Sequence, residues 1–211
     1  MFGFLNVYKP KGITSHDVVS ALRRITKVKQ IGHTGTLDPF AEGVLPICIG
    51  KATRLIEYLD DDKAYTGTIQ LGSSTTTYDL EGEEVNFSDK KVTLNEIEAA
   101  LDKFRGEIDQ LPPIYSAIKV NGKKLYEYAR EGKEVKIEPR RVNISKLEIL
   151  EYDETNRRLT LHIECSKGTY IRSIAHDLGT ELTTFGHLVK LVRVKAGMFE
   201  VNNAVSLEHI Q

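Results

Sequence analysis

A single aspartate closes a turn that is rich in glycine and threonine. Residues 32–39 have the sequence GHTGTLDP, so Asp38 is followed by a proline and preceded, five positions earlier, by His33. An aspartate before proline is often only a turn former, because its carboxylate accepts hydrogen bonds from nearby backbone N–H groups. A carboxylate held in this way can also act as a nucleophile. Asp38 is therefore the first candidate for chemistry in this sequence.

Two commoner kinds of site do not fit the same stretch. A phosphate-binding Walker loop ends in Gly-Lys-Ser or Gly-Lys-Thr, whereas Lys51 is followed by Ala52. No Gly-x-Ser-x-Gly elbow occurs, and Cys48 lies inside an apolar run, so a Ser or Cys nucleophile is not indicated. Neither Cys48 nor Cys165 has a second Cys or a His at metal-ligand spacing. We expect both to be buried thiols, and we expect no metal or other cofactor.

Asp38 lies in one of five sequence blocks that point to a known family. Residues 32–54, GHTGTLDPFAEGVLPICIGKATR, resemble the catalytic motif of the bacterial tRNA pseudouridine synthases of the TruB family almost residue for residue. Four more blocks resemble motifs of the same family and follow the family's order: NVYKPKGITSHD, KAYTGTIQLGSSTTTYDLEGE, LPPIYSAIKVNGKKLYEYAREG and CSKGTYIRSIAHDLG. A coincidental match of five separated motifs in order is improbable.

The resemblance implies an isomerase that acts on a uridine already in RNA. In this reaction the bond from N1 of the base to the sugar breaks, the base turns while it is held, and C5 bonds to the same sugar carbon. The reaction needs no redox chemistry and no energy input, which agrees with a sequence that shows no nucleotide-binding loop or metal cluster. The implied substrate is the uridine at position 55 in the TΨC loop of tRNA, which the enzyme flips out of its stack.

Three residues are implied as catalytic: Asp38, Tyr65 and Arg172. Asp38 would attack the sugar or the base, or would initiate elimination, and the sequence does not choose among these. A carboxylate in a dry pocket tends to take up a proton, so a fixed cation beside it should keep it charged. Arg172 is implied as this cation, because a guanidinium pairs with a carboxylate at two points and keeps its own charge. Tyr65 is implied as the ring that stacks on the uracil and whose hydroxyl accepts or relays a proton; a tyrosine that fills the core is the alternative.

Five further residues are implied in substrate binding: His33, Tyr170, Leu191, Lys9 and Lys11. A general-base role for His33 is less suitable than a flat wedge that fills the space left by the flipped base, because the histidine lies on a glycine-rich loop. Tyr170 and Leu191 would line the pocket, with ordinary core packing as the alternative. Lys9 and Lys11 would hold backbone phosphates beside the flipped nucleotide.

The elements that must position these residues indicate an α+β fold. Strands and helices do not alternate regularly, which favours a mixed, mainly antiparallel sheet flanked by helices and loops. Together with the resemblance, this implies the pseudouridine synthase catalytic fold. Apolar alternation predicts strands, and capping residues with helical spacing predict helices. The predicted strands are residues 4–8, 45–49, 64–72, 115–120, 141–150, 158–165 and 187–199, and the predicted helices are residues 14–25, 93–106, 125–132 and 169–178.

Length and composition predict a single domain. The 211 residues, 40% of them hydrophobic, are enough for one core over 1–211, from which the polar region around 73–91 is an excursion. No apolar run approaches the length of a membrane span, so we expect a cytoplasmic protein. Family members commonly continue into a C-terminal RNA-binding domain, often of the PUA type, and we expect no such domain within this sequence.

The net charge of −1 hides an uneven distribution. Basic residues outnumber acidic ones within 1–36, 118–141 and 182–199, whereas acidic residues collect at 60–62 and 79–109. A basic side could meet the T-arm of a tRNA. We expect no membrane partner and no guide RNA, and we expect a monomer. A tRNA-folding protein that keeps this scaffold without its chemistry is the alternative function, but the presence of Asp38, Tyr65 and Arg172 favours the enzyme.

Overall fold

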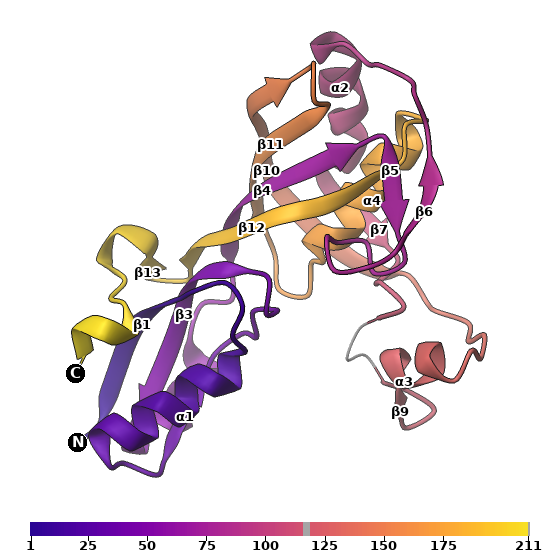
Figure 1. Ribbon diagram of the computed structural model, residues 1–211. Helices are drawn as coiled ribbons and strands as arrows, with labels where there is room; N and C mark the ends of the chain where they lie inside the picture. The colour runs from indigo at the N-terminus through magenta and orange to yellow at the C-terminus, as the bar shows by residue number, and fades with distance from the viewer. Residues whose placement is uncertain (116–118, 211) are drawn as a thin grey trace. The chain divides into compact units, whose positions relative to one another are not determined.

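The computed structural model describes residues 1–115 and 119–210, and the chain divides into two compact units (Figure 1). The first unit comprises Met1–Thr66 and Lys190–Gln211, and the second comprises Gly67–Val189. Strands β4 (Lys63–Leu71) and β12 (Gly186–Ala196) belong to both, because the division falls inside each of them. The single domain over residues 1–211 stays a prediction.

The first unit is built around β3 (Glu42–Ile49). β1 (Gly3–Lys9) and β2 (Ile31–His33) pair with β3 antiparallel, and β12 pairs with it in parallel. Its other elements are α1 (Ser15–Thr26), the 3₁₀ helices η1 (Gly50–Tyr58), η3 (Val201–Asn203) and η4 (Leu207–Ile210), and the short strand β13 (Phe199–Glu200). Fully buried apolar side chains of β1, α1 and β3 form its core: Val7, Val18, Leu22, Val44, Leu45 and Ile47.

Helix α1 begins where the sequence predicts it. The Thr14 hydroxyl accepts a hydrogen bond from the N–H of Asp17, and the Asp17 carboxylate accepts one from the N–H of Thr14. This reciprocal capping box satisfies two backbone donors that the helix itself cannot pair. Val18 and Leu22 lie one turn apart and are both fully buried, so the apolar stripe that predicted the helix is the face that it buries.

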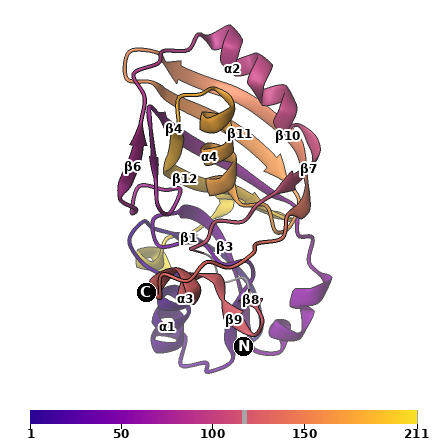
Figure 2. The same cartoon turned by 90° about the vertical axis from the view of Figure 1, so that its right-hand side faces the viewer.

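In the second unit the strand order is β12-β4-β11-β10-β7. β10 (Arg140–Asp153) pairs antiparallel with both β11 (Arg158–Cys165) and β7 (Gly106–Gln110). Helix α2 (Leu94–Leu101) packs against both β10 and α4 (Ile171–Glu181) (Figure 2). The remaining elements are the antiparallel pairs β5 (Ser73–Thr75) with β6 (Glu84–Phe87) and β8 (Lys119–Val120) with β9 (Lys123–Lys124), α3 (Leu125–Arg130) and the 3₁₀ helix η2 (Asp102–Phe104).

The predicted fold class, α+β with a mainly antiparallel sheet, is confirmed. Of the strand predicted at 115–120, Lys119–Val120 form β8, while residues 116–118 lie outside the described part. The strand predicted to reach residue 199 ends at Ala196, because Gly197 turns the chain with a φ of 56°. Sequence patterns did not predict β7, η1 or the β5–β6 pair inside the polar region.

Both cysteines, Cys48 and Cys165, are buried as predicted. Within the two described stretches, 1–115 and 119–210, no helix is both long enough and apolar enough to cross a membrane.

Gly179 in α4 offers a test of the packing in the second unit. Alanine is normally the better helix former, by about 1 kcal/mol. A Cβ at this position would, however, lie 2.3 Å from the backbone nitrogen of Gly186 and 2.3 Å from the carbonyl carbon of Phe185. We therefore expect Gly179→Ala to lower the free energy of unfolding by roughly 1–3 kcal/mol, the usual cost of overpacking.

Urea unfolding would measure this change, with Gly32→Ala as the control. At Gly32 the nearest atom to an added Cβ is the flexible end of Ile56, 3.8 Å away, so little loss is expected. A Gly179→Ala variant as stable as the control would contradict the packing described.

Candidate active site

Asp38 lies on the loop between β2 and β3, and this loop is fastened to the chain around the start of α1. The Ser15 hydroxyl donates to the carbonyl oxygen of Leu37 (3.0 Å) and accepts a hydrogen bond from its N–H (2.9 Å). On the other side of Asp38, the N–H of Gly12 donates to the carbonyl oxygen of Pro39 (2.7 Å). Leu37 is buried and Asp38 half-buried, so the anchored backbone presents the carboxylate at the edge of the core.

A buried arginine, Arg193, donates hydrogen bonds to the same loop and to the strand that follows it. Arg193 of β12 is 1% exposed, and its guanidinium donates to the carbonyl oxygens of Val44 (2.8 Å) and Gly35 (3.0 Å). Gly43 lets the backbone of β12 lie close to β3, because a Cβ there would lie 2.2 Å from the backbone carbonyl oxygen of Arg193. Its φ of 109° is also one that other residues rarely adopt. Arg193 thus connects the Asp38 loop, through Gly35, and strand β3, through Val44, to β12.

The two lysines predicted to bind phosphate have different environments. Lys9 is fully buried, whereas Lys11 is exposed. Burial lowers the pKa of Lys9, and the carboxylate of Asp38 is the first of the nearby charges that oppose this effect. The Lys9 ammonium donates to three backbone carbonyl oxygens, those of Pro10 (2.8 Å), Ile13 (2.7 Å) and Pro39 (3.3 Å). In this structure Lys9 therefore braces the Asp38 loop from within, and Lys11 faces solvent.

His33, Tyr65 and Leu191 also belong to the first unit. His33 ends β2 directly before the Asp38 loop and is half-buried. Burial, followed by the positive charge of Arg193, lowers the pKa of His33, so the imidazole is favoured in its neutral form. Tyr65 in β4 is 9% exposed and Leu191 in β12 is 6% exposed. The first unit thus contains six of the eight predicted site residues: Asp38, His33, Tyr65, Leu191, Lys9 and Lys11.

Arg172, in the second unit, is the second residue of α4 and is 9% exposed. Its guanidinium donates to the carbonyl oxygens of Thr77 (3.3 Å) and Tyr115 (3.2 Å). It also lies 3.6 Å from the carboxylate of Asp79, which is 4% exposed. Arg172 is therefore held by the segment that follows β5, which contributes both a carbonyl and a carboxylate. Planar guanidinium geometry suits such multiple contacts.

The Asp79 carboxylate is itself fixed by its neighbours. One of its oxygens accepts hydrogen bonds from the Thr77 hydroxyl (2.6 Å) and from the N–H of Glu81 (3.0 Å). Gly82 closes this turn, because a Cβ there would lie 2.3 Å from the Thr77 hydroxyl oxygen. The other oxygen of Asp79 is the one that faces Arg172. Both oxygens of the Asp79 carboxylate are therefore held, one by the turn and one by Arg172.

Tyr170, the residue before α4, is held by a buried glutamine. The Gln110 side chain accepts a hydrogen bond from the N–H of Tyr170 (2.8 Å) and donates one to its carbonyl oxygen (3.0 Å). Gln110 is 2% exposed and lies at the end of β7. This pair of bonds fixes where α4 begins, and hence where Arg172 emerges from the helix two residues later.

Asp177 lies in α4, one helical turn after Ser173. The pKa of its carboxyl group differs from the ordinary value. Burial raises the pKa of Asp177 from 3.8 to about 6. A raised carboxyl pKa means that the folded protein binds this proton more tightly than the unfolded chain does. Ionised Asp177 is thus a source of instability near neutral pH.

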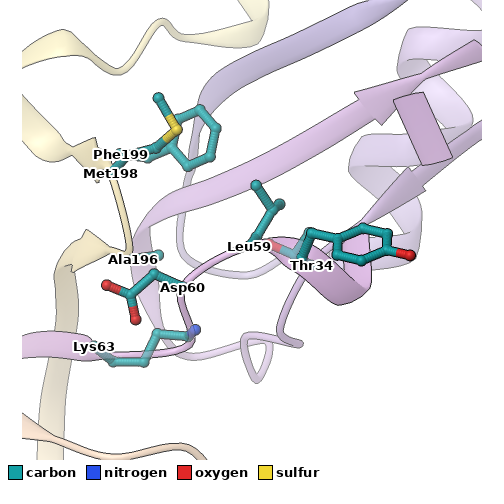
Figure 3. A pocket seen from close by; sticks show the side chains of 8 residues that line it. Thr34, Leu59, Asp60, Lys63, Ala196, Met198 and Phe199 are labelled. Carbon is teal, nitrogen blue, oxygen red and sulfur yellow. The ribbon is translucent and has the colours of Figure 1, made fainter. Parts of the chain in front are cut away.

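One pocket of the first unit lies beside the Asp38 loop and has a cavity volume of about 150 Å³ (Figure 3). It is lined by Thr34, Tyr58, Leu59, Asp60, Lys63, Ala196, Met198 and Phe199. None of the eight predicted site residues lines it, although Thr34 directly follows His33 and Lys63 precedes Tyr65 by two positions.

Two residues of these clusters, Arg193 and Asp79, were not predicted as site residues. For Arg193 a signal was available, because strand alternation places it on the same face as Leu191, and an arginine on a buried face needs a partner. For Asp79 the signal was weaker: an aspartate three residues before Gly82 indicates a turn, but not the cation that it faces.

Comparisons with known proteins show which family and which structures this chain is similar to. A family described as "TruB family pseudouridylate synthase (N terminal domain)" matches residues 23–171. The chain is 50% identical to "tRNA pseudouridine synthase B" of Clostridium novyi (strain NT), over all of this chain and 72% of the relative. It is 47% identical to the protein of the same name from Staphylococcus haemolyticus (strain JCSC1435), over 99% of this chain and 70% of the relative.

Two solved structures share the fold over nearly the whole chain. A Cbf5-Nop10-Gar1 complex matches with a TM-score of 0.77 and 30% identity, over 98% of this chain and 53% of that one. An H/ACA RNP bound to a substrate RNA containing 2'-deoxyuridine matches with a TM-score of 0.74 and 28% identity, over 98% of this chain and 51% of that one. This chain therefore spans about half the length of the solved relatives.

The raised pKa of Asp177 predicts a pH-dependent stability. Its contribution is fully present below the ordinary pKa of 3.8 and is lost as the pH rises through about 6. Asp177→Asn, which removes the charge and keeps the shape, should therefore raise the melting temperature near pH 8. The expected rise is roughly 2–4 °C, the shift that about 1 kcal/mol produces in a domain of this size.

Thermal unfolding of both proteins between about pH 4.5 and 8 checks this, since the difference should shrink as the pH falls through about 6. Asp89→Asn, at an exposed position, is the matched control. A difference that stays constant with pH would mean that Asp177 ionises as it does in the unfolded chain.

Proposed function

The chain belongs to the TruB family of pseudouridylate synthases, and from this premise we propose that it converts uridine 55 in the TΨC loop of tRNA to pseudouridine. It is a pseudouridine synthase, an isomerase of the tRNA-processing machinery. The observation that carries the finer proposal is the Asp38 loop, which is braced by Ser15, Lys9 and Arg193 and presents one half-buried carboxylate.

The proposed reaction breaks the bond between N1 of the uracil and C1' of the sugar and forms a bond from C5 to the same carbon. The proton that C5 loses is balanced by the proton that N1 gains, so no oxidant, reductant or energy donor is consumed. Asp38 supplies the anionic carboxylate that the cleavage step requires. A rigid loop favours this step, because a catalytic group held in place spends little entropy in reaching its reacting geometry.

Tyr65 and Arg172 are proposed as the partners of Asp38. The ring of Tyr65 serves as the platform on which the detached uracil stacks while it turns. Arg172 is proposed as the cation that pairs with the reacting carboxylate, because a planar guanidinium can contact a carboxylate at two points. Leu191 and Tyr170 are proposed to contact the substrate nucleotide and to keep water away from it.

His33 is proposed as the wedge that takes the place of the flipped base. A neutral, flat imidazole can stack between bases without bringing a second charge into the RNA, and burial beside Arg193 favours this neutral form. Lys11 is proposed to contact a phosphate beside the flipped nucleotide. The buried ammonium of Lys9 is assigned instead to the support of the Asp38 loop.

We propose that the enzyme works as a monomer in the cytoplasm on the T-arm of tRNA, without a guide RNA. The two relatives named tRNA pseudouridine synthase B described above are 50% and 47% identical to this chain, whereas the chain from the H/ACA particle is 28% identical. A tRNA-folding protein without catalysis remains the competing function, and the presence of Asp38, Tyr65 and Arg172 argues against it.

Incubation with an unmodified tRNA transcript, followed by position-resolved detection of pseudouridine, tests the proposed function. The wild-type protein should modify position 55. Asp38→Asn should bind the tRNA with similar affinity and form no detectable pseudouridine, because the amide keeps the shape and loses the charge. Substantial turnover by this variant would remove Asp38 from the mechanism, and tRNA binding without turnover by the wild type would favour the folding protein.

Because Lys9 is buried and Lys11 is exposed, we expect substitution of Lys11 to weaken tRNA binding and substitution of Lys9 to lower stability. Lys11→Ala should reduce the slope of log affinity against log salt by about one, because one phosphate contact is lost. Lys9→Met should leave that slope unchanged and lower the free energy of unfolding by roughly 1–3 kcal/mol, because buried carbonyl groups lose their donor. Salt titrations of tRNA binding and urea unfolding measure the two effects. The assignment is wrong if Lys9→Met changes the slope and Lys11→Ala does not.

A further inference from the structure

A second contact joins α4 to the segment that binds Arg172. His176 lies four residues after Arg172, and side chains with this spacing share one face of a helix. The ring of His176 stacks on the ring of Tyr78, with centroids 3.8 Å apart and planes 9° from parallel. Tyr78 in turn lies between Thr77 and Asp79, the two residues of the segment that contact Arg172. The segment is therefore attached to α4 at two successive turns of the helix.

Tyr78 adopts a backbone conformation that costs energy. Its φ of 67° lies in the left-handed region, which a bulky residue other than glycine rarely enters. The N–H of Tyr78 donates to the carbonyl oxygen of Thr75 (3.3 Å), and its own carbonyl accepts from the N–H of Leu188 (2.9 Å). Strain of this kind persists only where the surroundings impose it, and it is common near functional sites.

The contact uses the faces of the two rings and not their polar atoms. Among the described residues, Nδ1 of His176 is one of the buried polar atoms without a hydrogen-bond partner, so the contact of His176 with Tyr78 does not depend on this nitrogen. Burial also lowers the pKa of His176, so the ring is favoured as neutral. An imidazole retained under these conditions serves as a flat surface at van der Waals distance from Tyr78.

We propose that Tyr78 and His176 form a clamp that positions Asp79 and the Thr77 carbonyl against Arg172. Both are positioning residues, because they act on the reaction only through Arg172. The backbone turn at Tyr78 directs the Thr77 carbonyl and the Asp79 carboxylate toward the guanidinium of Arg172. The stacked rings hold that turn in place. The inference rests on the proposed function only in giving Arg172 a catalytic role; the clamp itself is a property of the second unit.

Four single variants separate the stack from the other features of these residues. Tyr78→Phe and His176→Phe keep an aromatic ring, whereas Tyr78→Asn and His176→Ala remove it. Asparagine is chosen because it tolerates the left-handed conformation better than most residues, so that the change tests the ring and not the backbone. The double variant Tyr78→Asn/His176→Ala completes a thermodynamic cycle.

Single-turnover rates at saturating unmodified tRNA, together with tRNA affinities, are the first measurement. The two variants that lose a ring should react about tenfold more slowly, as expected when a catalytic group is displaced by a fraction of an ångström, with affinity changed less than about threefold. The two variants that keep a ring should react within about twofold of wild type. The double variant should be no slower than the slower single variant, because both changes remove one contact.

Backbone hydrogen exchange of residues 76–82 in the free protein is the second measurement. Protection should fall in Tyr78→Asn and His176→Ala and should remain in the two phenylalanine variants, because the ring stack is what holds the turn. This measurement does not use activity, so it reports on the clamp even if the wild-type protein forms no pseudouridine. Such a result would overturn the proposed function and leave the clamp standing.

Three results would overturn the clamp. The first is unchanged protection of residues 76–82 in the variants without a ring. The second is loss of rate in Tyr78→Phe equal to that in Tyr78→Asn, which would assign the role to the hydroxyl. The third is a uniform loss of thermal stability in all four variants with normal single-turnover rates below the melting transition, which would reduce the pair to core packing.

Discussion

The buried guanidinium of Arg193 is the interaction on which the first unit's candidate site depends. A buried cation needs hydrogen bonds in place of those it made with water, and Arg193 donates them to the carbonyl of Gly35 in the Asp38 loop and to that of Val44 in β3. The requirement to satisfy the arginine therefore also fixes the loop that carries Asp38. The buried ammonium of Lys9 also holds this loop, because it donates a hydrogen bond to the carbonyl of Pro39.

The second unit also contains a buried guanidinium, that of Arg172, and here a carboxylate lies beside it. Arg172 is bound by the carbonyls of Thr77 and Tyr115 and faces Asp79, whose own geometry is set by a tight turn. Backbone carbonyls hold a guanidinium in place without neutralising it, since each contributes only a dipole. In both units, then, the basic side chains are oriented mainly by the backbone, which makes local chain conformation as important to the chemistry as the side chains themselves.

The sequence predicted the elements with strong periodicity and missed those without it. α1, β3, β10 and β11 follow from capping residues or apolar alternation. β7, with the sequence GEIDQ, has too little apolar character to stand out, and it is a strand because β10 supplies its hydrogen bonds. Asp38, Tyr65 and Arg172 were predicted through family resemblance, whereas the burial of Lys9 and the pairing of Arg172 with Asp79 depend on contacts between distant segments that no local pattern contains.

Several basic side chains are buried, and this changes the net charge of the surface that other macromolecules meet. Among residues 1–115 and 119–210, the buried lysine and arginine residues are Lys9, Arg172 and Arg193, and the one buried acidic residue is Asp79. The solvent-facing groups are accordingly more acidic than the formal charge of −1 suggests. An excess of surface acid weakens the long-range attraction of any polyanion, so close approach of an RNA relies on the local groups of exposed lysines and arginines.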